Sequence, residues 1–219
     1  ELQENAVLAG IYDRARTPIL PGQIEYDNED GYYNLGSWEG NPIDSFASMI
    51  TGIHVKNVTI CGKGVLDGRA DFENWWSRPK DKIRAWRPRM IFLNHCENIT
   101  VVGVTVQNSP AWNLHPYFSN QIRFLDMEVK GPANSHNTDG CDPESCTNVE
   151  IAGVHFSVGD DCIAIKSGKI YMGKKFKVPS KHIHIRQSWM QDGHGAVTVG
   201  SEIAAGVDDI HISKCRFSN

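Results

Sequence analysis

The chain of 219 residues is 40% hydrophobic and 22% charged, with a formal net charge of -4. It is long enough to bury a core and fits one globular domain. The acidic balance gives no basic surface for nucleic acid, and no segment has the length and apolarity of a membrane span. We therefore expect neither nucleic acid nor a membrane as a partner, while the oligomeric state stays open.

The N-terminal segment, residues 1–5, has neither the basic start nor the apolar run of a secretory signal. Secreted, periplasmic and cytoplasmic locations therefore all stay open. The six cysteines lack the paired spacing of zinc ligands, since only Cys141 and Cys146 lie close together. Most of them are expected to be buried free thiols that pack as small hydrophobic side chains.

Six short segments share a polar residue, often Asn, followed by a β-branched residue, one spacer and a further apolar residue. From the second copy onward they recur at about 23 to 34 residues, within the range of solenoid repeats. Apolar and polar residues alternate in each copy, which is the pattern of a half-buried strand. In chain order, the predicted strands are residues 57–60, 98–101, 121–124, 148–151, 182–185 and 209–212.

One such strand cannot bury its inward face, but stacked copies form a continuous core, which predicts a ladder of coils. Long helical periodicity is missing, and this argues against helices that alternate with strands. A β-sandwich is the competing fold, since it also has short strands at regular intervals. The Asn that begins several repeats favours the solenoid, because stacked Asn side chains can satisfy turn amides from coil to coil.

Loops of different length separate the predicted strands, and loops on one face of a solenoid usually carry its function. The longest insertion, residues 68–88, contains Trp75, Trp76, Trp86 and several basic residues; a second insertion spans residues 166–181. The tryptophans either wall off one end of a cleft or pin the loop to the solenoid, and at least one is expected to pin it. No linker composition divides the chain, so residues 1–219 are predicted to form one domain.

Acid or histidine residues occupy matching positions in three consecutive repeats. If the coils stack in register, these side chains lie close together on one face. Three crowded carboxylates repel one another, so at least one is expected to keep its proton to a higher pH than a free aspartate. Glycoside hydrolysis requires one acid and one base at the same pH. The three segments are residues 137–140 (Asn-Thr-Asp-Gly), 159–162 (Gly-Asp-Asp-Cys) and 193–195 (Gly-His-Gly).

Each segment alone also has an ordinary structural interpretation. Asp139 and Gly140 form a common turn dipeptide. Asp160 and Asp161 alone fit a solvated loop or half of a calcium site. His194 between two glycines indicates a close backbone approach, which is weak evidence by itself. Their order and spacing together favour a catalytic site.

Residues 137–140, 159–161 and 193–195, followed by Val-Gly-Ser at 199–201, resemble the polygalacturonases of glycoside hydrolase family 28. The resemblance is closest over residues 98–219. It implies an all-β fold, a right-handed single-stranded parallel β-helix. It also implies hydrolysis of α-1,4-galacturonosyl bonds of pectin or homogalacturonan, with inversion and without a metal or other cofactor. The expected partner is thus an acidic polysaccharide or oligogalacturonide.

The resemblance also implies a role for each residue of the site. Asp160 is the general acid that protonates the leaving oxygen, Asp139 and Asp161 activate the attacking water, and His194 tunes the acid or holds the substrate. The residues themselves agree with these roles, because an oxocarbenium-like transition state gains from nearby carboxylates while the leaving group needs a proton.

A polyanionic sugar also needs cations near the catalytic carboxylates. Lys166 is the best candidate contact, and the lysines that follow it, up to residue 177, either form uronate subsites or solvate a loop. Trp112 and His115 are predicted contacts because residues 108–115 resemble a cleft-lining segment of exo-acting members. Asn137 is a further predicted contact. A second basic run over residues 78–89 could bind carboxylates through guanidinium groups.

Members of the family have an Arg-x-Lys pair on the coil after the histidine, and this chain has no such pair after His194. At the other end, residue 1 is predicted to lie within an early coil. We therefore expect a stretch that lacks the N-terminal cap and the C-terminal coils. The alternatives are a rhamnogalacturonan or xylogalacturonan hydrolase, a calcium-dependent pectate lyase and a non-catalytic carbohydrate-binding β-helix. The Gly-His-Gly segment favours homogalacturonan, and the insertion at residues 68–88 favours exo action.

Overall fold

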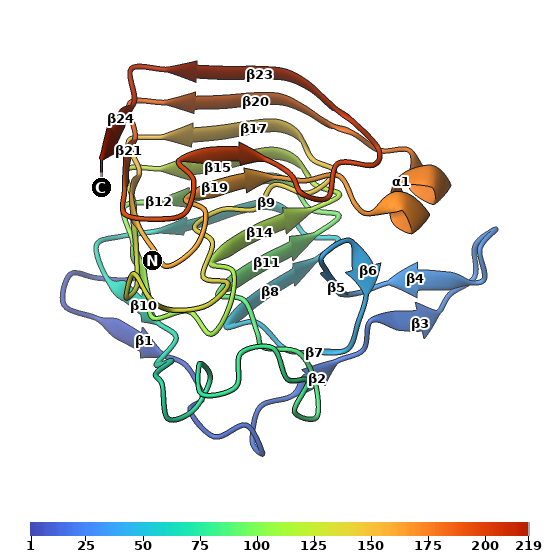
Figure 1. Ribbon diagram of the computed structural model, residues 1–219, viewed down its shortest axis with the longest axis horizontal. Coiled ribbons are helices and arrows are strands. Elements are labelled where there is room, and N and C mark those ends of the chain that lie inside the picture. The colour runs from blue at the N-terminus through green and yellow to red at the C-terminus, as the bar shows by residue number, and fades with distance from the viewer. Residues whose placement is uncertain (219) are drawn as a thin grey trace.

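The computed structural model describes residues 1–218, so residue 219 of the predicted domain lies outside the described residues. Strands stack coil upon coil into a ladder with three sheets along its sides (Figure 1). Successive coils pair in parallel. The ladder of coils is therefore the predicted parallel β-helix, and the antiparallel pairing of a β-sandwich is not its architecture.

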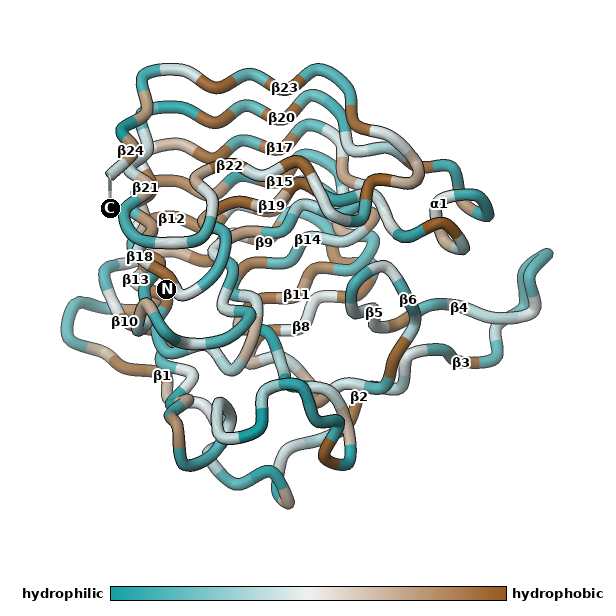
Figure 2. Tube along the Cα trace, viewed as in Figure 1, coloured by the Kyte–Doolittle hydropathy of each residue, from teal (hydrophilic) through white to brown (hydrophobic). Residues whose placement is uncertain are grey.

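The six predicted repeat strands form one parallel sheet. Ile99 pairs with Val58 on one side and with Ile122 on the other, so apolar positions align from coil to coil. Figure 2 shows the alternation of hydrophobic and hydrophilic residues along these strands. In spatial order the sheet contains β23 (Val207–Ser213), β20 (Ser180–Arg186), β17 (Thr147–Ala152), β15 (Asn120–Leu125), β12 (Glu97–Val102) and β9 (Lys56–Cys61).

The polar residue at the head of each repeat has a left-handed backbone, which Asn and Asp tolerate better than other side chains. Stacked amides also join the coils, since Asn98 Nδ2 donates to Asn57 Oδ1 at 2.7 Å and Asn148 Nδ2 donates to Asn120 Oδ1 at 2.9 Å. The first residue of each repeat therefore marks a bend in the backbone, and the residues after it form the strand. The six heads, with φ between 53° and 58°, are Asn57, Asn98, Gln121, Asn148, His182 and Asp209.

Two further parallel sheets complete the coils. One contains β1 (Val7–Ala9), β10 (Val65–Asp67), β13 (Thr105–Gln107), β16 (Glu128–Lys130), β18 (His155–Ser157), β21 (Trp189–Gln191) and β24 (Arg216–Ser218). The other contains β8 (Ile50–Ile53), β11 (Ile91–Asn94) and β14 (Leu114–Tyr117), and single bridges at Cys141 and Glu144 connect it to β19 (Ile163–Ile165) and β22 (Val197–Val199).

Side chains that point inward from the three sheets form one continuous core. Val106, Val129, Phe156 and Met190 occupy the same register position in four successive coils, and each is at most 2% exposed. Each such burial stabilises the fold by about 1.5–3 kcal/mol relative to an exposed side chain. Cysteines contribute to this core as predicted: Cys96, Cys141, Cys146 and Cys162 are buried, and all six cysteines are free thiols.

Short antiparallel pairs lie between β1 and β8 in the chain and extend from the side of the ladder (Figure 1). They join β2 (Ile19–Leu20) to β7 (Ser45–Phe46), β3 (Gln23–Glu25) to β4 (Tyr32–Asn34), and β5 (Ser37–Trp38) to β6 (Asn41–Pro42). The insertion at residues 166–181 contains a short helix, α1 (Ile170–Phe176). Within residues 1–218, no helix is long and apolar enough to cross a membrane.

The insertion at residues 68–88 is attached to the solenoid by its tryptophans. Trp75 and Trp76 are 1% and 4% exposed and pack in a small cluster with Phe46. The indole of Trp76 also donates to the carbonyl of Ser109 at 3.1 Å. The expectation that at least one tryptophan pins this loop is confirmed, because both rings are too deeply buried to stack on a sugar.

Candidate active site

Asp139, Asp160 and Asp161 meet at one point of the ladder, as the stacking of coils predicts. Each offers a carboxylate oxygen, and the three oxygens lie within 4.8 Å of one another. Backbone hydrogen bonds hold the coils in this register: the amide of Gly140 donates to the carbonyl of Asp161 at 2.9 Å, and that of Asn113 donates to the carbonyl of Asp139 at 2.8 Å. Residues 21 and 22 positions apart therefore share one site.

Two glycines explain how the coils come so close. A Cβ on Gly140 would collide with the carbonyl oxygen of Cys162 and with the ring of Phe156. A Cβ on Gly195 would lie 2.7 Å from Oδ1 of Asp161. The Asp-Gly and Gly-His-Gly segments thus use glycine where neighbouring coils leave no room for a side chain.

Asp139 is the deepest member of the cluster, at 4% exposure, and its Oδ1 has no hydrogen-bond partner among the described residues. Burial, with the charge of Asp160 as the next cause, raises the pKa of Asp139 to about 8. Burial also raises the pKa of the half-buried Asp161. The expected carboxyl with a raised pKa is therefore present: both Asp139 and Asp161, which the resemblance makes the base pair, have one.

Asp160 lies nearer the surface and contacts His194. Nδ1 of His194 is 3.3 Å from Oδ1 of Asp160, and the side chains are 71% and 21% exposed. The same Oδ1 accepts a hydrogen bond from the backbone amide of Asp161 at 3.0 Å. Of the three aspartates, Asp160 is therefore the one with a histidine partner at the open side of the site.

The four predicted substrate contacts lie beside or beneath the cluster. Asn137 is half-buried, and its Oδ1 accepts a hydrogen bond from Arg87 at 2.7 Å. Trp112 is 2% exposed and stacks on Trp38 with ring centroids 4.4 Å apart. His115 is fully buried. Contact of these side chains with substrate stays a prediction, because the free protein shows them packed within the fold.

Lys166, the fourth of these residues, is 5% exposed and is held by acids. Its Nζ lies 2.8 Å from Oε2 of Glu202 and 3.8 Å from Oδ1 of Asp142. It also lies 5.0 Å from the centre of the Trp112 ring. Its charge counteracts the raised pKa of Asp139, so it acts on the cluster without an exposed ammonium group. A direct contact with substrate stays a prediction here too.

Buried acids behind the cluster were missed by sequence reasoning. Burial raises the pKa of Asp142 well above its ordinary value and that of Glu144 to about 7. Glu144 Oε2 lies 2.9 Å from Nε2 of His115, whose pKa burial lowers well below its ordinary value. Arg89, whose pKa burial lowers to about 10, supplies a second cation to this network. The spacing of residues 139, 142 and 144 in one coil was the available signal.

Two groups of side chains in the described part of the chain have ligand atoms close enough to hold a metal ion. One is the aspartate cluster, whose oxygens are the donors that hard cations take. The other contains His184, Asp209 and His211, on the six-stranded sheet.

Comparisons with known proteins agree with this geometry. The family model described as "Glycosyl hydrolases family 28" matches residues 31–219. A protein of Vitis vinifera named "Probable polygalacturonase" is 32% identical over 212 residues, which cover 95% of this chain and 41% of that protein. An "Endo-polygalacturonase" of Pectobacterium parmentieri is 33% identical over 205 residues, which cover 88% of this chain and 48% of that protein.

Among solved structures, a hyperthermoactive exopolygalacturonase from Thermotoga maritima matches with a TM-score of 0.82 and 28% identity. The match covers 98% of this chain and 53% of that chain. The likeness confirms the predicted right-handed parallel β-helix. The chain spans about half the length of the relatives it matches.

Proposed function

The chain belongs to glycosyl hydrolases family 28, and from that membership we propose that it hydrolyses α-1,4-galacturonosyl bonds of homogalacturonan from a chain end. The observation that carries the proposal is the cluster of Asp139, Asp160 and Asp161, with His194 against Asp160. The printed names of its relatives, probable polygalacturonase and exopolygalacturonase, support the same substrate.

In the proposed mechanism, the cluster holds one proton at neutral pH because burial raises the pKa of Asp139 to about 8. That proton reaches Asp160 when a substrate oxygen approaches, across a gap that one water can bridge. Asp160 then protonates the leaving oxygen, and the carboxylates of Asp139 and Asp161 take a proton from the attacking water. The same carboxylates stabilise the positive charge that develops on the sugar.

Inversion of the anomeric carbon is a separate part of the proposal and rests on the family. Inverting glycosidases commonly separate their two carboxyl groups by about 6.5–9.5 Å to admit water. The oxygens of the present cluster lie within 4.8 Å of one another, which is nearer the spacing of retaining enzymes. The stereochemistry therefore needs its own measurement: proton NMR of the first product should detect the β-anomer, and an initial α-anomer would contradict inversion.

Exo action is supported by a wall beside the third sheet. Glu39 lies in the turn between β5 and β6, and its Oε2 forms an ion pair with Nζ of Lys169 at 3.1 Å. Asp30 pairs with Lys175 of α1 at 3.1 Å, and Trp38 stacks on Trp112. Residues 30–43 and the α1 insertion thus meet over the sheet. This wall, rather than the insertion at residues 68–88, is the feature that would close one end of a cleft.

The decisive experiment compares the protein with its Asp160→Asn variant on polygalacturonate, with reducing-sugar release as the assay. Loss of a general acid should lower the rate by about 100-fold to about 10,000-fold. The matched control is Asp81→Asn, an exposed aspartate paired with Arg78, which should leave the rate unchanged. Release of monomer or dimer from the start would support exo action, whereas a ladder of oligomers would contradict it.

The same assay separates the alternatives. Faster cleavage of rhamnogalacturonan or xylogalacturonan would replace the proposed substrate. A product that absorbs in the ultraviolet and a rate that a chelator abolishes would indicate a lyase. Binding of polygalacturonate by the parent protein without turnover would favour a carbohydrate-binding β-helix, and it would overturn the hydrolase proposal for this chain.

A further inference from the structure

A second cluster of titratable side chains lies on the outer face of the six-stranded sheet, on β20 and β23. Strand alternation produces it, because Ile183, Ile185 and Ile210 point toward the core and their neighbours point outward. His184 and His211 pair directly in the register of the two strands. The outward residues are His182, His184, Asp209 and His211, and all of them are exposed.

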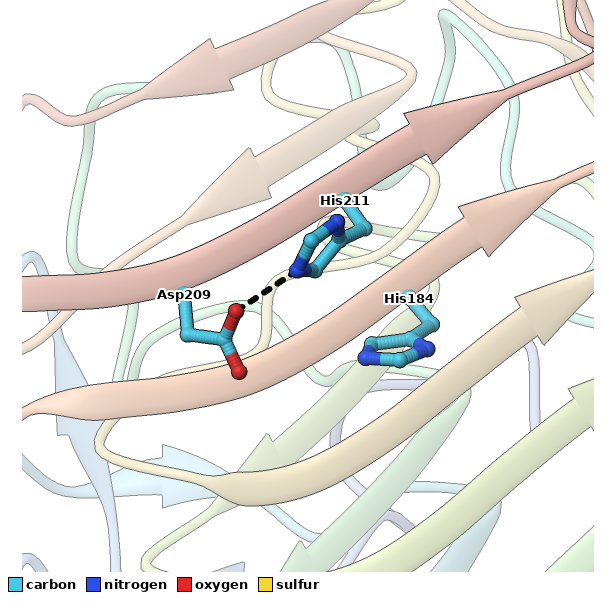
Figure 3. A group of neighbouring side chains, drawn as sticks. All are labelled: His184, Asp209 and His211. Atoms are coloured by element: carbon cyan, nitrogen blue, oxygen red, sulfur yellow. Dashed lines mark hydrogen bonds and ion pairs between the residues drawn. The ribbon is translucent and has the colours of Figure 1, made fainter.

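Figure 3 shows the rings of His184 and His211 and the carboxylate of Asp209 facing one common point. Each offers one ligand atom, and the three atoms lie within 4.8 Å of one another. The rings of His184 and His211 have centroids 5.1 Å apart, and Nε2 of His211 lies 2.7 Å from Oδ1 of Asp209. Two imidazole nitrogens and one carboxylate oxygen are ligands that Zn²⁺, Cu²⁺ and Ni²⁺ accept.

We propose that His184, Asp209 and His211 form a binding site for a divalent transition-metal ion of the Zn²⁺ class, which ties β20 to β23. Three protein ligands leave the fourth tetrahedral position to water. The ion replaces the hydrogen bond between His211 and Asp209, and the proton of that hydrogen bond passes to solvent. It joins the last two described coils by side chains, in addition to their backbone ladder.

His182 supports the site as a positioning residue. Its Nδ1 is hydrogen-bonded to Oδ2 of Asp209, the oxygen that His211 does not contact. Such outer partners orient a ligating carboxylate and keep it available to the metal. All three ligands are exposed, so an ion can reach them directly from solvent.

This site is separate from the proposed active site. The aspartate cluster lies in segments that lead into the third sheet, whereas the histidines lie on the six-stranded sheet. The ligands also differ, since the aspartate cluster offers oxygen alone and the histidine cluster offers mainly nitrogen. Zinc-class ions favour the second set, and calcium or magnesium favours the first.

The test is calorimetric titration of untagged, chelator-treated protein with ZnCl₂. We expect the protein to bind one equivalent of Zn²⁺ saturably. Its affinity for Zn²⁺ should fall by about tenfold or more in His184→Gln and in His211→Gln, because loss even of a residue that only supports a ligand lowers metal affinity by about 10–100-fold. His54→Gln is the matched control, because it removes an exposed histidine from outside the cluster. Co²⁺ should give the visible absorption of a tetrahedral ion in the parent and in the control.

Circular dichroism establishes that each variant is folded before titration. Absence of saturable Zn²⁺ binding to the parent protein would overturn the proposal. Equal affinity in the parent and in both histidine variants would also overturn it, and would place the ion elsewhere. A rise in melting temperature with Zn²⁺ in the parent and in His54→Gln, absent from both cluster variants, would support the link between β20 and β23.

Discussion

The ammonium of Lys166 lies 2.8 Å from Oε2 of Glu202, and both side chains are almost completely enclosed, at 6% and 4% exposure. Asp142, fully buried, lies 3.8 Å from the same ammonium. The charge of Lys166 also counteracts the raised pKa of Asp139 and of Glu144. A single lysine therefore compensates several acids beneath the proposed active site, and such acids are tolerated in a core only when they are paired.

Replacement of Lys166 by Met should destabilise the fold strongly. The acids around it would lose their main cation, and loss of one partner from a buried pair costs about 3–5 kcal/mol. Urea unfolding at neutral pH measures the change. Lys174→Met is the control, because Lys174 is exposed in α1 and surface changes stay within about 0.5 kcal/mol. Equal stability of the two variants would show that the buried network does not depend on Lys166.

Sequence reasoning predicted the parts of this molecule that depend on local pattern. The six repeat strands follow from the alternation of apolar and polar residues, and Asp139, Asp160 and Asp161 meet because the coils keep register. The burial of Lys166 was not predictable in this way. It depends on Glu202, which lies 36 residues away, and on Trp112, whose ring centre lies 5.0 Å from the ammonium. The sequence shows a lysine near the proposed active site, but it does not show whether that lysine is exposed or buried.

Gly140→Ala should lower both stability and activity. The new methyl group would collide with the carbonyl oxygen of Cys162 and with the Phe156 ring, so the coil that carries Asp139 must move away from its neighbour. Overpacking of this kind costs about 1–3 kcal/mol. Gly131→Ala is the control, because a Cβ there meets nothing nearer than Ser135 Oγ at 3.8 Å. Melting temperature and polygalacturonate cleavage measured on both variants test the prediction, which fails if the Gly140 variant retains parental values.

Asp139 should make the folded state less stable as the pH rises. Burial raises its folded pKa from 3.8 to about 8, so within that window the folded chain holds a proton that the unfolded chain has lost. Stability then falls with increasing pH, by at most about 1.4 kcal/mol per pH unit.

Asp139→Asn cannot titrate at this position and should remove this part of the slope, leaving the parts that Glu144, Asp142 and Asp161 contribute through their own raised pKa values. Urea unfolding at several pH values between 3.8 and about 8 measures the slope, and the exposed Asp27→Asn serves as control. An unchanged slope in Asp139→Asn would mean that Asp139 ionises normally in the folded protein.

His194→Ala should lower activity and leave stability nearly unchanged. The side chain is 71% exposed, so its loss removes little packing, and surface changes stay within about 0.5 kcal/mol. Its Nδ1 is 3.3 Å from Oδ1 of Asp160. If this contact tightens to a hydrogen bond in the transition state, it contributes about 1.5–3 kcal/mol, or about tenfold to about 150-fold in rate.

Steady-state kinetics on an oligogalacturonide separate the two roles that the resemblance allows for His194. A fall in kcat with little change in KM would mean that His194 acts through Asp160, whereas a rise in KM at constant kcat would mean that it holds the substrate. His194→Gln should retain part of the activity if a hydrogen-bond donor is enough, and His54→Ala should retain all of it because His54 lies outside the site. Parental kinetics in His194→Ala would remove His194 from the mechanism, since no contact with Asp160 would then contribute to the reaction.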